Sequence, residues 1–336
     1  MIAKMEWRET DGMNYTEEMK IRVLRGEQIN RQEALRLSEE PLDRLREAAE
    51  EIRREKCGNG FDLCTIVNAK CGRCSEDCKY CAQSVHYRTA CEESYPLLSA
   101  AELVAGAKHN AQQGVVRYSI VTSGRRLSDT EVEQVCESIR RIKAETSIEV
   151  CVSLGLLDEA QFRRIRAAGA SRVHCNLETS ARYFPSICTT HTYEEKTATL
   201  QAAKRAGLTV CSGGILGLGE TMEDRIDMVL TARALGIKSI PVNLLNPIPG
   251  TPCEKNTPLT NEEACRCVAL FRFLIPDASI RLAGGRGLVG DRGEACFRSG
   301  ANAAISGDML TTAGITVESD REMLHTLGFE VRRCNG

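Results

Sequence analysis

Short β-branched runs alternate with helical runs over most of this chain, and this alternation constrains its fold more than any other feature. Eight segments are typical of strands: residues 61–70, 115–124, 147–155, 171–180, 208–217, 238–247, 279–286 and 303–309. Each is followed by a segment typical of a helix: residues 99–114, 128–145, 157–169, 192–207, 221–236, 260–274, 293–300 and 319–328. Several helical segments open on Ser, Asp or Thr and close on Gly, as helix ends commonly do.

Eight strand–helix repeats match a complete (β/α)8 barrel of the TIM type, an α/β fold, in both number and size. A doubly wound open sheet uses the same alternation, and a count of strands does not exclude it. Residues 14–55 are rich in strong helix formers and predict two or three short helices. We therefore expect an N-terminal helical extension over residues 1–60 and a barrel with a C-terminal segment over residues 61–336.

Charge and hydropathy exclude several classes of partner. The chain has 44 Lys and Arg against 46 Asp and Glu, so neither nucleic acid nor an anionic membrane is expected to be its main partner. No segment approaches the roughly 18 consecutive apolar residues of a membrane span, and the N-terminus lacks the apolar core of a secretory signal. We expect a cytoplasmic protein whose 17 cysteines are metal ligands or buried thiols rather than disulfides.

A cluster of cysteines directly follows the first predicted strand, in the order Cys71, Cys74, Cys78 and Cys81. Closely spaced thiolates on a loop suit zinc or an iron–sulfur cluster. Three ligands, Cys74, Cys78 and Cys81, would leave one iron of a four-iron cluster open to a small molecule. The loop also follows the C-terminal end of a barrel strand, where catalytic groups collect. A structural zinc site that includes Cys71 is the alternative.

The spacing Cys74-x-x-x-Cys78-x-x-Cys81, with Tyr80 before the last cysteine, resembles the signature of the radical S-adenosylmethionine (SAM) superfamily. The segments EDCKYCAQS, HCNLETS, TTHTYEEK, VCSGGILGLGE, SIPVNLL, IRLAGGR and GANAAISGDMLTTAG resemble the biotin synthase family, in the same order, over residues 60–330. This resemblance implies a [4Fe–4S] cluster that cleaves SAM to a 5′-deoxyadenosyl radical. It also implies removal of hydrogen from two carbons of dethiobiotin, and an auxiliary iron–sulfur cluster that supplies the sulfur of biotin.

The resemblance also implies which residues bind SAM. By position, Tyr80 lies near the adenine, and Asn176 and Glu178 meet the ribose. Lys196 falls where the family has a basic residue, usually Arg, that faces the SAM carboxylate. Lysine keeps the charge at this position but loses the bidentate fork of arginine. No catalytic side chain is implied, because SAM itself supplies the radical.

The remaining family positions concern the adenine and the substrate. Ile215 lies against the adenine, within the run 213–220, whose glycines we expect to let the backbone approach a ligand closely. His174, Asn176 and Asn243 fall at positions that contact dethiobiotin. For His174, a core histidine that is satisfied by its protein neighbours is the alternative. The family further implies flavodoxin or ferredoxin as electron donor, and a homodimer.

One position departs from the family pattern. The commonest biotin synthases hold an auxiliary [2Fe–2S] cluster with a cysteine on each of strands two, three and five and an arginine on strand seven. Cys151, Cys211 and Arg281 match that pattern, but strand two carries Ser119, and a hydroxyl is a much poorer iron ligand than a thiolate. Cys64 on strand one can share an interior layer with the other three, because alternate strands fill each layer of a barrel.

We therefore predict that Cys64, Cys151 and Cys211 hold the auxiliary cluster, with Arg281 beside it. In one version the cluster has four irons, Arg281 is a neighbour, and one iron is free for an exogenous sulfide. In the other version the cluster is [2Fe–2S] and Arg281 is a ligand. The alternative for Cys64 itself is a small buried apolar residue.

Two other functional classes stay open at this point. One is another radical SAM barrel, such as a hydrogenase-maturation enzyme or a methylornithine-synthase-like mutase, which would not need Cys151 and Cys211. The other is a non-catalytic iron–sulfur or zinc protein. No Ser/His/Asp constellation or pair of carboxylates in the sequence competes with the radical chemistry.

Overall fold

Nine parallel strands form one curved sheet in the computed structural model, which describes residues 13–89 and 94–334. Their hydrogen-bonded order is β5-β4-β3-β2-β1-β9-β8-β7-β6, and a short tenth strand pairs with the start of β1. The strands are β1 Gly60–Lys70, β2 Arg117–Thr122, β3 Glu149–Ser153, β4 Arg172–His174, β5 Thr209–Cys211, β6 Gly214–Leu216, β7 Ser239–Leu244, β8 Ser279–Leu282, β9 Ala303–Ser306 and β10 Glu330–Val331.

Strands β5 and β6 are two halves of a single barrel strand. The nitrogen of Ser212, between them, donates to the carbonyl of Ser239 in β7 (3.0 Å), while the carbonyl of Gly213 accepts from Glu178, beyond β4 (3.0 Å). The two ends of the sheet therefore meet at this strand, and the nine strands occupy eight barrel positions, as the sequence predicts. Glycine is required at the break, because a Cβ on Gly213 would lie 2.0 Å from the carbonyl oxygen of Pro241.

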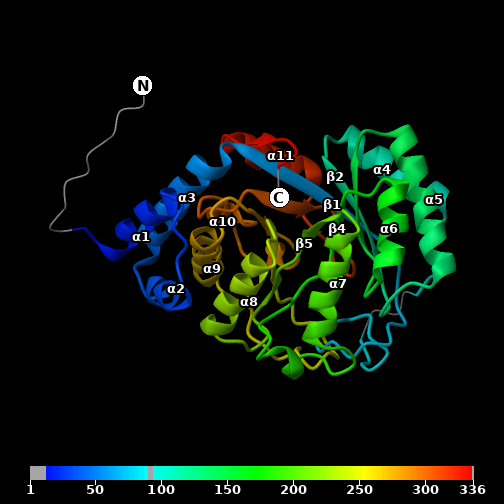
Figure 1. Cartoon of the computed structure of the whole chain (residues 1–336), viewed down its shortest axis with the longest axis horizontal. Coiled ribbons are helices and arrows are strands. Elements are labelled where there is room, and N and C mark those ends of the chain that lie inside the picture. Colours follow the sequence, from blue (N-terminus) through cyan, green and yellow to red (C-terminus); the bar gives the residue numbers. More distant parts are fainter. Residues whose placement is uncertain (1–12, 90–93, 335–336) are drawn as a thin grey trace.

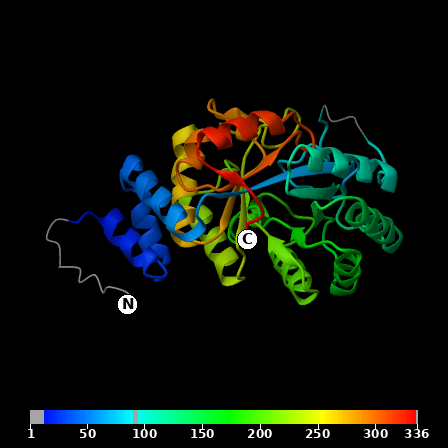
Figure 2. The same ribbon diagram turned by 90° about the horizontal axis from the view of Figure 1, so that it is seen from above.

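Helices surround the strands, as Figure 2 shows from one end of the barrel. Six of the barrel helices begin with a capping box, in which the side chain of the N-cap residue and that of the third helical residue bind each other's backbone nitrogen. The helices are α1 Tyr15–Leu24, α2 Arg31–Ser38, α3 Leu42–Cys57, α4 Ala100–Gln112, α5 Asp129–Glu145, α6 Glu159–Ala168, α7 Tyr193–Arg205, α8 Met222–Ala234, α9 Asn261–Leu274, α10 Glu294–Phe297 and α11 Val317–Thr326.

Helices α1–α3 lie against one side of the barrel (Figure 1). Helix α3 packs on α9, α2 packs on α8, and α1 packs on α3. The apolar side chains of Leu45 and Ile52 in α3 are fully buried in these contacts. Residues 15–57 of the predicted extension thus form three helices, as their composition indicates.

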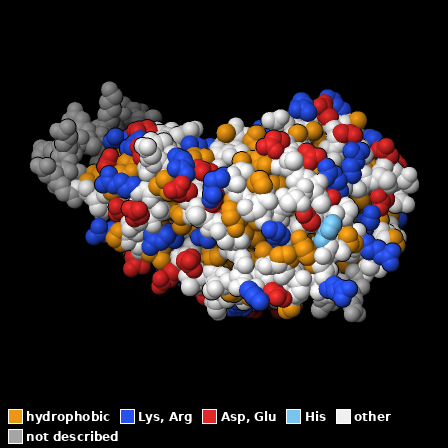
Figure 3. All heavy atoms as spheres, turned by 90° about the horizontal axis from the view of Figure 1, so that it is seen from below, with side chains coloured by type: hydrophobic (Ala, Val, Ile, Leu, Met, Phe, Trp, Pro, Cys, Tyr) orange, Lys and Arg blue, Asp and Glu red, His pale blue; other side chains and the backbone are white. Residues whose placement is uncertain are grey.

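Charges of both signs are interspersed over the face of the molecule in Figure 3. This agrees with the formal net charge of −2. Among the helices that the structure describes, none combines the length and the hydrophobicity needed to cross a lipid bilayer.

The C-terminal segment covers the end of the barrel at which the strands begin, and the sequence did not predict this. Figure 2 shows the C-terminus over the middle of the ring of helices. The nitrogen of Arg332 donates to the carbonyl of Phe61 (3.0 Å), and that of Cys334 donates to Asp62 Oδ2 (3.2 Å). The pairing of β10 with β1 is only two residues long, so it has no alternating pattern to detect.

A buried carboxylate links three strands at this end of the barrel. Asp62 Oδ1 accepts from Arg281 Nη2 at 2.6 Å, and its Oδ2 accepts from Arg117 Nε at 2.8 Å. Asp62 and Arg281 are both 0% exposed. Burial alone would raise the pKa of Asp62, but Arg281 and Arg117 hold that pKa well below its usual range. Strands β1, β2 and β8 are therefore joined by charged hydrogen bonds.

We predict that Asp62→Asn lowers the free energy of unfolding by about 3–5 kcal/mol, because it leaves Arg281 buried without a counter-charge. Urea unfolding of the cluster-free protein under anaerobic conditions would measure this. The matched control is Asp43→Asn, on the exposed surface of α3, which should change the free energy by less than about 1 kcal/mol. Equal effects of the two substitutions would contradict the prediction.

Candidate active site

The cysteine triplet lies on the loop that follows β1. Hydrogen bonds within the loop fix its course: the nitrogen of Cys81 donates to the carbonyl of Cys78 (3.0 Å), and that of Cys74 donates to the carbonyl of Gln83 (3.0 Å). The Gln83 side chain also accepts from the nitrogen of Gly72 (2.9 Å). The three thiols are partly buried, and all three line one cavity. Soft donors held together at a cavity wall fit an iron–sulfur cluster with one open iron.

Cys71 stands apart from this set. It is buried and exchanges backbone hydrogen bonds with Tyr95 (both 3.2 Å), and it does not line the cavity. The geometry thus favours the triplet alone over a four-cysteine zinc site.

The cavity lies at the carboxyl ends of the barrel strands and has a volume of about 420 Å³. It brings together every residue that we predicted to meet SAM or substrate, from strands, loops and a helix that are far apart in the sequence. These residues are Tyr80, His174, Asn176, Glu178, Lys196, Ile215 and Asn243.

Glu178 and Lys196 form a buried charged pair in the cavity wall. Lys196 Nζ lies 3.4 Å from Glu178 Oε1 and donates to the carbonyl of Asn176 at 2.9 Å. Burial alone would lower the pKa of Lys196, but Glu178 raises it, so the ammonium stays charged. Glu178 has a positive φ of 70°, which is unusual for a residue other than glycine and is common at functional sites. Its backbone is fixed in this conformation by bonds to Gly213 (3.0 Å) and Ile215 (2.9 Å).

The glycines that precede Ile215 do not have the role we expected. A Cβ on Gly214 would lie 2.3 Å from the carbonyl oxygen of Glu178 and from Met228 Sδ. Like Gly213, Gly214 is needed for contact between protein segments, not for the approach of a ligand. Ile215 itself does line the cavity.

Asn243 is held in place by the backbone. Its Nδ2 donates to the carbonyl of Gly214 (3.0 Å), and its Oδ1 accepts from the nitrogen of Gly284 (2.9 Å). The amide therefore presents a fixed face to the cavity and has little rotational freedom to lose on binding.

Cys64, Cys151 and Cys211 are all 0% exposed and face the barrel interior together with Arg281. Burial raises the pKa of Cys64, and the charges of Arg281, Cys151 and Cys211 all act on it, so these four side chains are neighbours. Cys64 precedes Ile66, a residue of the cavity wall, by two positions on β1. The three thiols therefore form a layer directly beneath the cavity, which we call the thiol layer.

His174 connects the cavity to the thiol layer. It lines the cavity and makes a hydrogen bond to Cys151. Burial alone would raise the pKa of the Cys151 thiol, but the hydrogen bond from His174 lowers it. Burial also lowers the pKa of His174, so its imidazole stays neutral.

Several buried polar atoms around this layer lack a hydrogen-bond partner within the described part of the chain. They are Ser119 Oγ, His174 Nε2 and Arg281 Nε. Ser119 pairs with Cys151 in the register of β2 and β3. Buried donors without partners are costly, so their convergence on three thiols fits an anionic group such as an iron–sulfur cluster.

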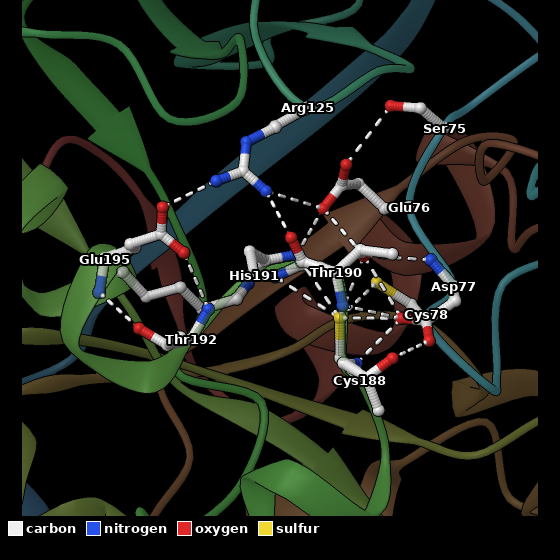
Figure 4. Close-up of polar contacts among 12 residues, drawn as sticks. Ser75, Glu76, Asp77, Cys78, Arg125, Cys188, Thr190, His191, Thr192 and Glu195 are labelled. Carbon is white, nitrogen blue, oxygen red and sulfur yellow. Dashed lines mark hydrogen bonds and ion pairs between the residues drawn. The ribbon is translucent and has the colours of Figure 1, made fainter.

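The structure also shows a polar cluster that sequence reasoning did not assemble (Figure 4). Cys188 Sγ lies 3.8 Å from Cys78 Sγ and 3.3 Å from His191 Nδ1. His191 Nδ1 lies 2.6 Å from Glu76 Oε2, and Cys188 donates to Asp77 Oδ1 at 3.3 Å. The spacing Cys188-x-x-His191 after the fourth strand is a signal that could have indicated these residues.

Comparison with known proteins gives the family of the chain. Residues 70–232 match the model of the radical SAM superfamily, and residues 241–330 match that of the biotin and thiamin synthesis associated domain. The second match includes most of β7 and all of β8 and β9, hence Asn243 and Arg281.

Known structures share the fold at low sequence identity. The crystal structure of a methylornithine synthase has a TM-score of 0.81 at 19% identity, and covers 94% of this chain and 97% of its own. The structure of the FeFe-hydrogenase maturase of Carboxydothermus hydrogenoformans has a TM-score of 0.81 at 17% identity, and the match covers 96% of this chain and 80% of the maturase chain. At these identities the likeness concerns the barrel alone.

Sequence relatives are much closer. A protein named biotin synthase 2, from Corynebacterium diphtheriae, is 57% identical over 96% of this chain and 98% of its own length. A biotin synthase from Akkermansia muciniphila is 57% identical over 95% of this chain and 99% of its own length. With the triplet, the cavity and the thiol layer all present, these matches leave one conclusion: the chain belongs to the biotin synthase family of radical SAM enzymes.

Proposed function

We propose that this biotin synthase binds SAM and dethiobiotin in the cavity, with Cys74, Cys78 and Cys81 holding the SAM-cleaving [4Fe–4S] cluster. The thiol layer of Cys64, Cys151 and Cys211 holds the auxiliary cluster. One observation carries the proposal: the cavity that contains the triplet is also lined by Ile66 and His174, which lie next to Cys64 and Cys151 of the thiol layer. When bound, the clusters supply the electron that cleaves SAM and the sulfur that closes the ring of biotin.

The cavity wall supports SAM through charge and shape. In the proposal the Lys196 ammonium faces the SAM carboxylate, and Glu178 accepts from the ribose hydroxyls through its Oε2. This oxygen is buried and has no hydrogen-bond partner within the described part of the chain, so it can accept such a bond. Burial raises the pKa of Tyr80 well above its usual value, so its neutral ring can contact the adenine.

The barrel excludes water from the radical. A primary alkyl radical removes hydrogen from unactivated carbons, and it must meet no other hydrogen donor first. The interior below the cavity is filled by buried side chains from the strands, and the C-terminal segment covers the far end. This leaves the mouth of the cavity as the route for substrate.

His174 and Asn243 position dethiobiotin in the proposal. The Nε2 of His174 has no partner among the described residues, whereas its bond to Cys151 ties the ring to the thiol layer. A substrate group bound at Nε2 would therefore lie between the cavity and the sulfur source. This supports a substrate contact over a histidine that the core alone satisfies.

Arg281 is a neighbour of the auxiliary cluster in the proposal, and not a ligand. Its Nη2 donates to Asp62 Oδ1 (2.6 Å), and its Nη1 donates to the carbonyls of Asp62 (2.9 Å) and Ala304 (3.2 Å). Burial alone would lower the pKa of Arg281, but Asp62 raises it, so the guanidinium stays charged. A charged group with both terminal nitrogens engaged is a poor metal ligand. This supports the version with three cysteines, a four-iron cluster and an exogenous sulfide.

From the family we infer a flavodoxin or ferredoxin as electron donor and a homodimer. From the sequence we infer a cytoplasmic location and a helical extension over residues 1–60, of which residues 1–12 lie outside the described residues, distinct from the barrel of residues 61–336. Sedimentation analysis of the purified chain would test the dimer, and reconstitution with each reductant would test the donor.

We predict that Cys64→Ala abolishes the auxiliary cluster and keeps the SAM cluster. Iron content should fall to that of the SAM cluster alone, and biotin formation should fall at least about 100-fold, since loss of even a supporting group costs a metal site up to that much. Anaerobic iron and sulfide analysis with Mössbauer spectra would measure it. Reductive cleavage of SAM should persist.

The matched control for Cys64→Ala is Cys136→Ala, because Cys136 is also fully buried but lies in α5, outside the barrel interior. It should keep both clusters. Unchanged auxiliary iron in Cys64→Ala would overturn the ligand assignment but leave the assignment of the triplet intact.

We predict that Arg281→Lys keeps the iron and sulfide of the auxiliary cluster, because lysine preserves the positive charge that the site requires. The readout is the Mössbauer spectrum of the auxiliary cluster, compared with that of Cys151→Ala, which should lose it. If Arg281→Lys loses auxiliary iron while the protein stays folded, Arg281 is a ligand and the [2Fe–2S] version is correct.

We predict that His174→Leu raises the KM for dethiobiotin by about 10- to 100-fold, the cost of leaving a buried polar partner unpaired. His174→Asn should restore much of the loss, because an amide can also donate. The KM for SAM serves as the internal control and should stay within about twofold. A parallel rise in both constants would indicate a collapsed cavity and not a lost contact.

A further inference from the structure

Cys188 and His191 have no role in the proposed function, yet Cys188 contacts Cys78 of the triplet and His191 contacts Cys188. Cys78 Sγ lies 3.8 Å from Cys188 Sγ, and the ring nitrogens of His191 lie 3.3 and 3.8 Å from Cys188 Sγ. One ligand atom from each of the three residues falls within 4.8 Å of the others. Figure 4 shows the three side chains converging.

These distances are those of ligands around one metal ion. With metal–sulfur bonds of about 2.3 Å and metal–nitrogen bonds of about 2.0 Å, tetrahedral angles place two sulfurs roughly 3.8 Å apart and a sulfur and a nitrogen roughly 3.5 Å apart. The observed 3.8 Å between the two thiols and 3.8 Å between Cys188 Sγ and His191 Nε2 are close to these values, and the ligand atoms of Cys78 and His191 lie within 4.8 Å of each other. Thiolates on different irons of a cubane are separated by two irons and lie farther apart, so Cys188 does not suit a ligand of the same cluster.

Two carboxylates, the buried Glu76 and the partly exposed Asp77, orient this group as the outer shell of a metal site commonly does. Glu76 Oε2 lies 2.6 Å from His191 Nδ1, which leaves Nε2 for a metal, and ligating histidines typically donate their other N–H to a carboxylate. Asp77 Oδ1 accepts from the Cys188 thiol (3.3 Å) and from the backbone nitrogen of Thr189 (2.8 Å). Glu76, Cys188 and His191 are all buried.

A path for an ion is also present. Cys78, His191 and Glu76 line the cavity, so an ion that enters from the mouth meets them directly. Cys188 lies just behind, in contact with Cys78. Two thiols and one imidazole are the ligands that zinc and ferrous iron prefer, and three protein ligands leave a fourth position for water.

We propose that Cys78, Cys188 and His191 bind a single divalent cation, Zn²⁺ or Fe²⁺, in the protein that has not yet received its SAM cluster. The site shares Cys78 with the triplet, so the cation and the cluster exclude each other. The binding site stands on the geometry alone, whereas the exclusion rests on the proposed role of the triplet.

Cobalt(II) is a suitable probe, because thiolate ligands give it charge-transfer bands and a tetrahedral site gives it intense d–d bands. We expect the full-length cluster-free protein to bind one Co²⁺ with both features, and Zn²⁺ to displace it. Cys188→Ala should weaken binding at least about 100-fold. Cys188→Ser, which keeps the size of the side chain, is the second variant, and His191→Gln should also weaken binding.

Two controls separate this site from the triplet. Cys136→Ala should bind Co²⁺ as the wild type does, because Cys136 lies in α5. Cys74→Ala should also keep the bands, because Cys74 is not part of the site, whereas Cys78→Ala should lose them. Loss of the bands in Cys74→Ala, or their full retention in Cys188→Ser, would overturn the proposal.

A second measurement tests the exclusion. Bound Zn²⁺ should slow assembly of the SAM cluster, followed by absorbance and iron content, by at least about tenfold in the wild type but not in Cys188→Ala. If cobalt binds only the wild type and zinc still leaves assembly unaffected, the site exists but the triplet does not use Cys78 as proposed. If neither effect occurs, the site is refuted while the function of the triplet stands.

Discussion

The barrel depends on how it neutralises two buried guanidinium groups. Arg117 and Arg281 are both buried, and Asp62 is the carboxylate that they share. Desolvation of charge is expensive, and one carboxylate does not balance two cations. The thiol layer lies next to Arg281, so thiolates or an anionic group there would supply further negative charge. In the proposed function, the stability of this end of the barrel and the retention of the auxiliary cluster therefore depend on the same charges.

The positions of the thiol layer and of the cavity follow from the alternation of side chains along parallel strands. Inward-facing positions stack in layers, so residues far apart in sequence occupy one level of the barrel. Asp62 and Cys64 are two residues apart on β1, which puts the ion network and the thiol layer on successive levels of the same interior. Ile66 then reaches the cavity, and the loop after β1 carries the triplet. Strand β1 therefore runs from the buried ion network, past the thiol layer, to the loop that carries the triplet.

Local signals account for the parts of the site that the sequence predicted. The triplet needs only a loop, and its spacing is visible in the chain. Cys151 and Cys211 follow from the resemblance to the family, whose ligand positions on strands three and five they match. The break at Gly213 could not be predicted, because the carbonyl that forbids a Cβ belongs to Pro241 on another strand. The contact of Cys188 with Cys78 is likewise tertiary, since it joins segments 110 residues apart.

Relative to the common family pattern, this chain has a serine on β2, Ser119, and a cysteine on β1, Cys64. This arrangement is consistent with the charge of Arg281 beside the thiol layer. Ser119 on β2 pairs with Ile66 on β1 and with Cys151 on β3. Cys64 lies two residues before Ile66 on β1, where it pairs with Arg117. Because alternate strands share a layer, a thiol on β1 can share one layer with those of Cys151 and Cys211, next to Arg281. Arg281 then donates to Asp62 with both terminal nitrogens while its charge still acts on the thiols. In the proposed function, the thiol of Cys64 thus takes the place of a ligand on β2, and Arg281 stays beside the layer as a fixed cation.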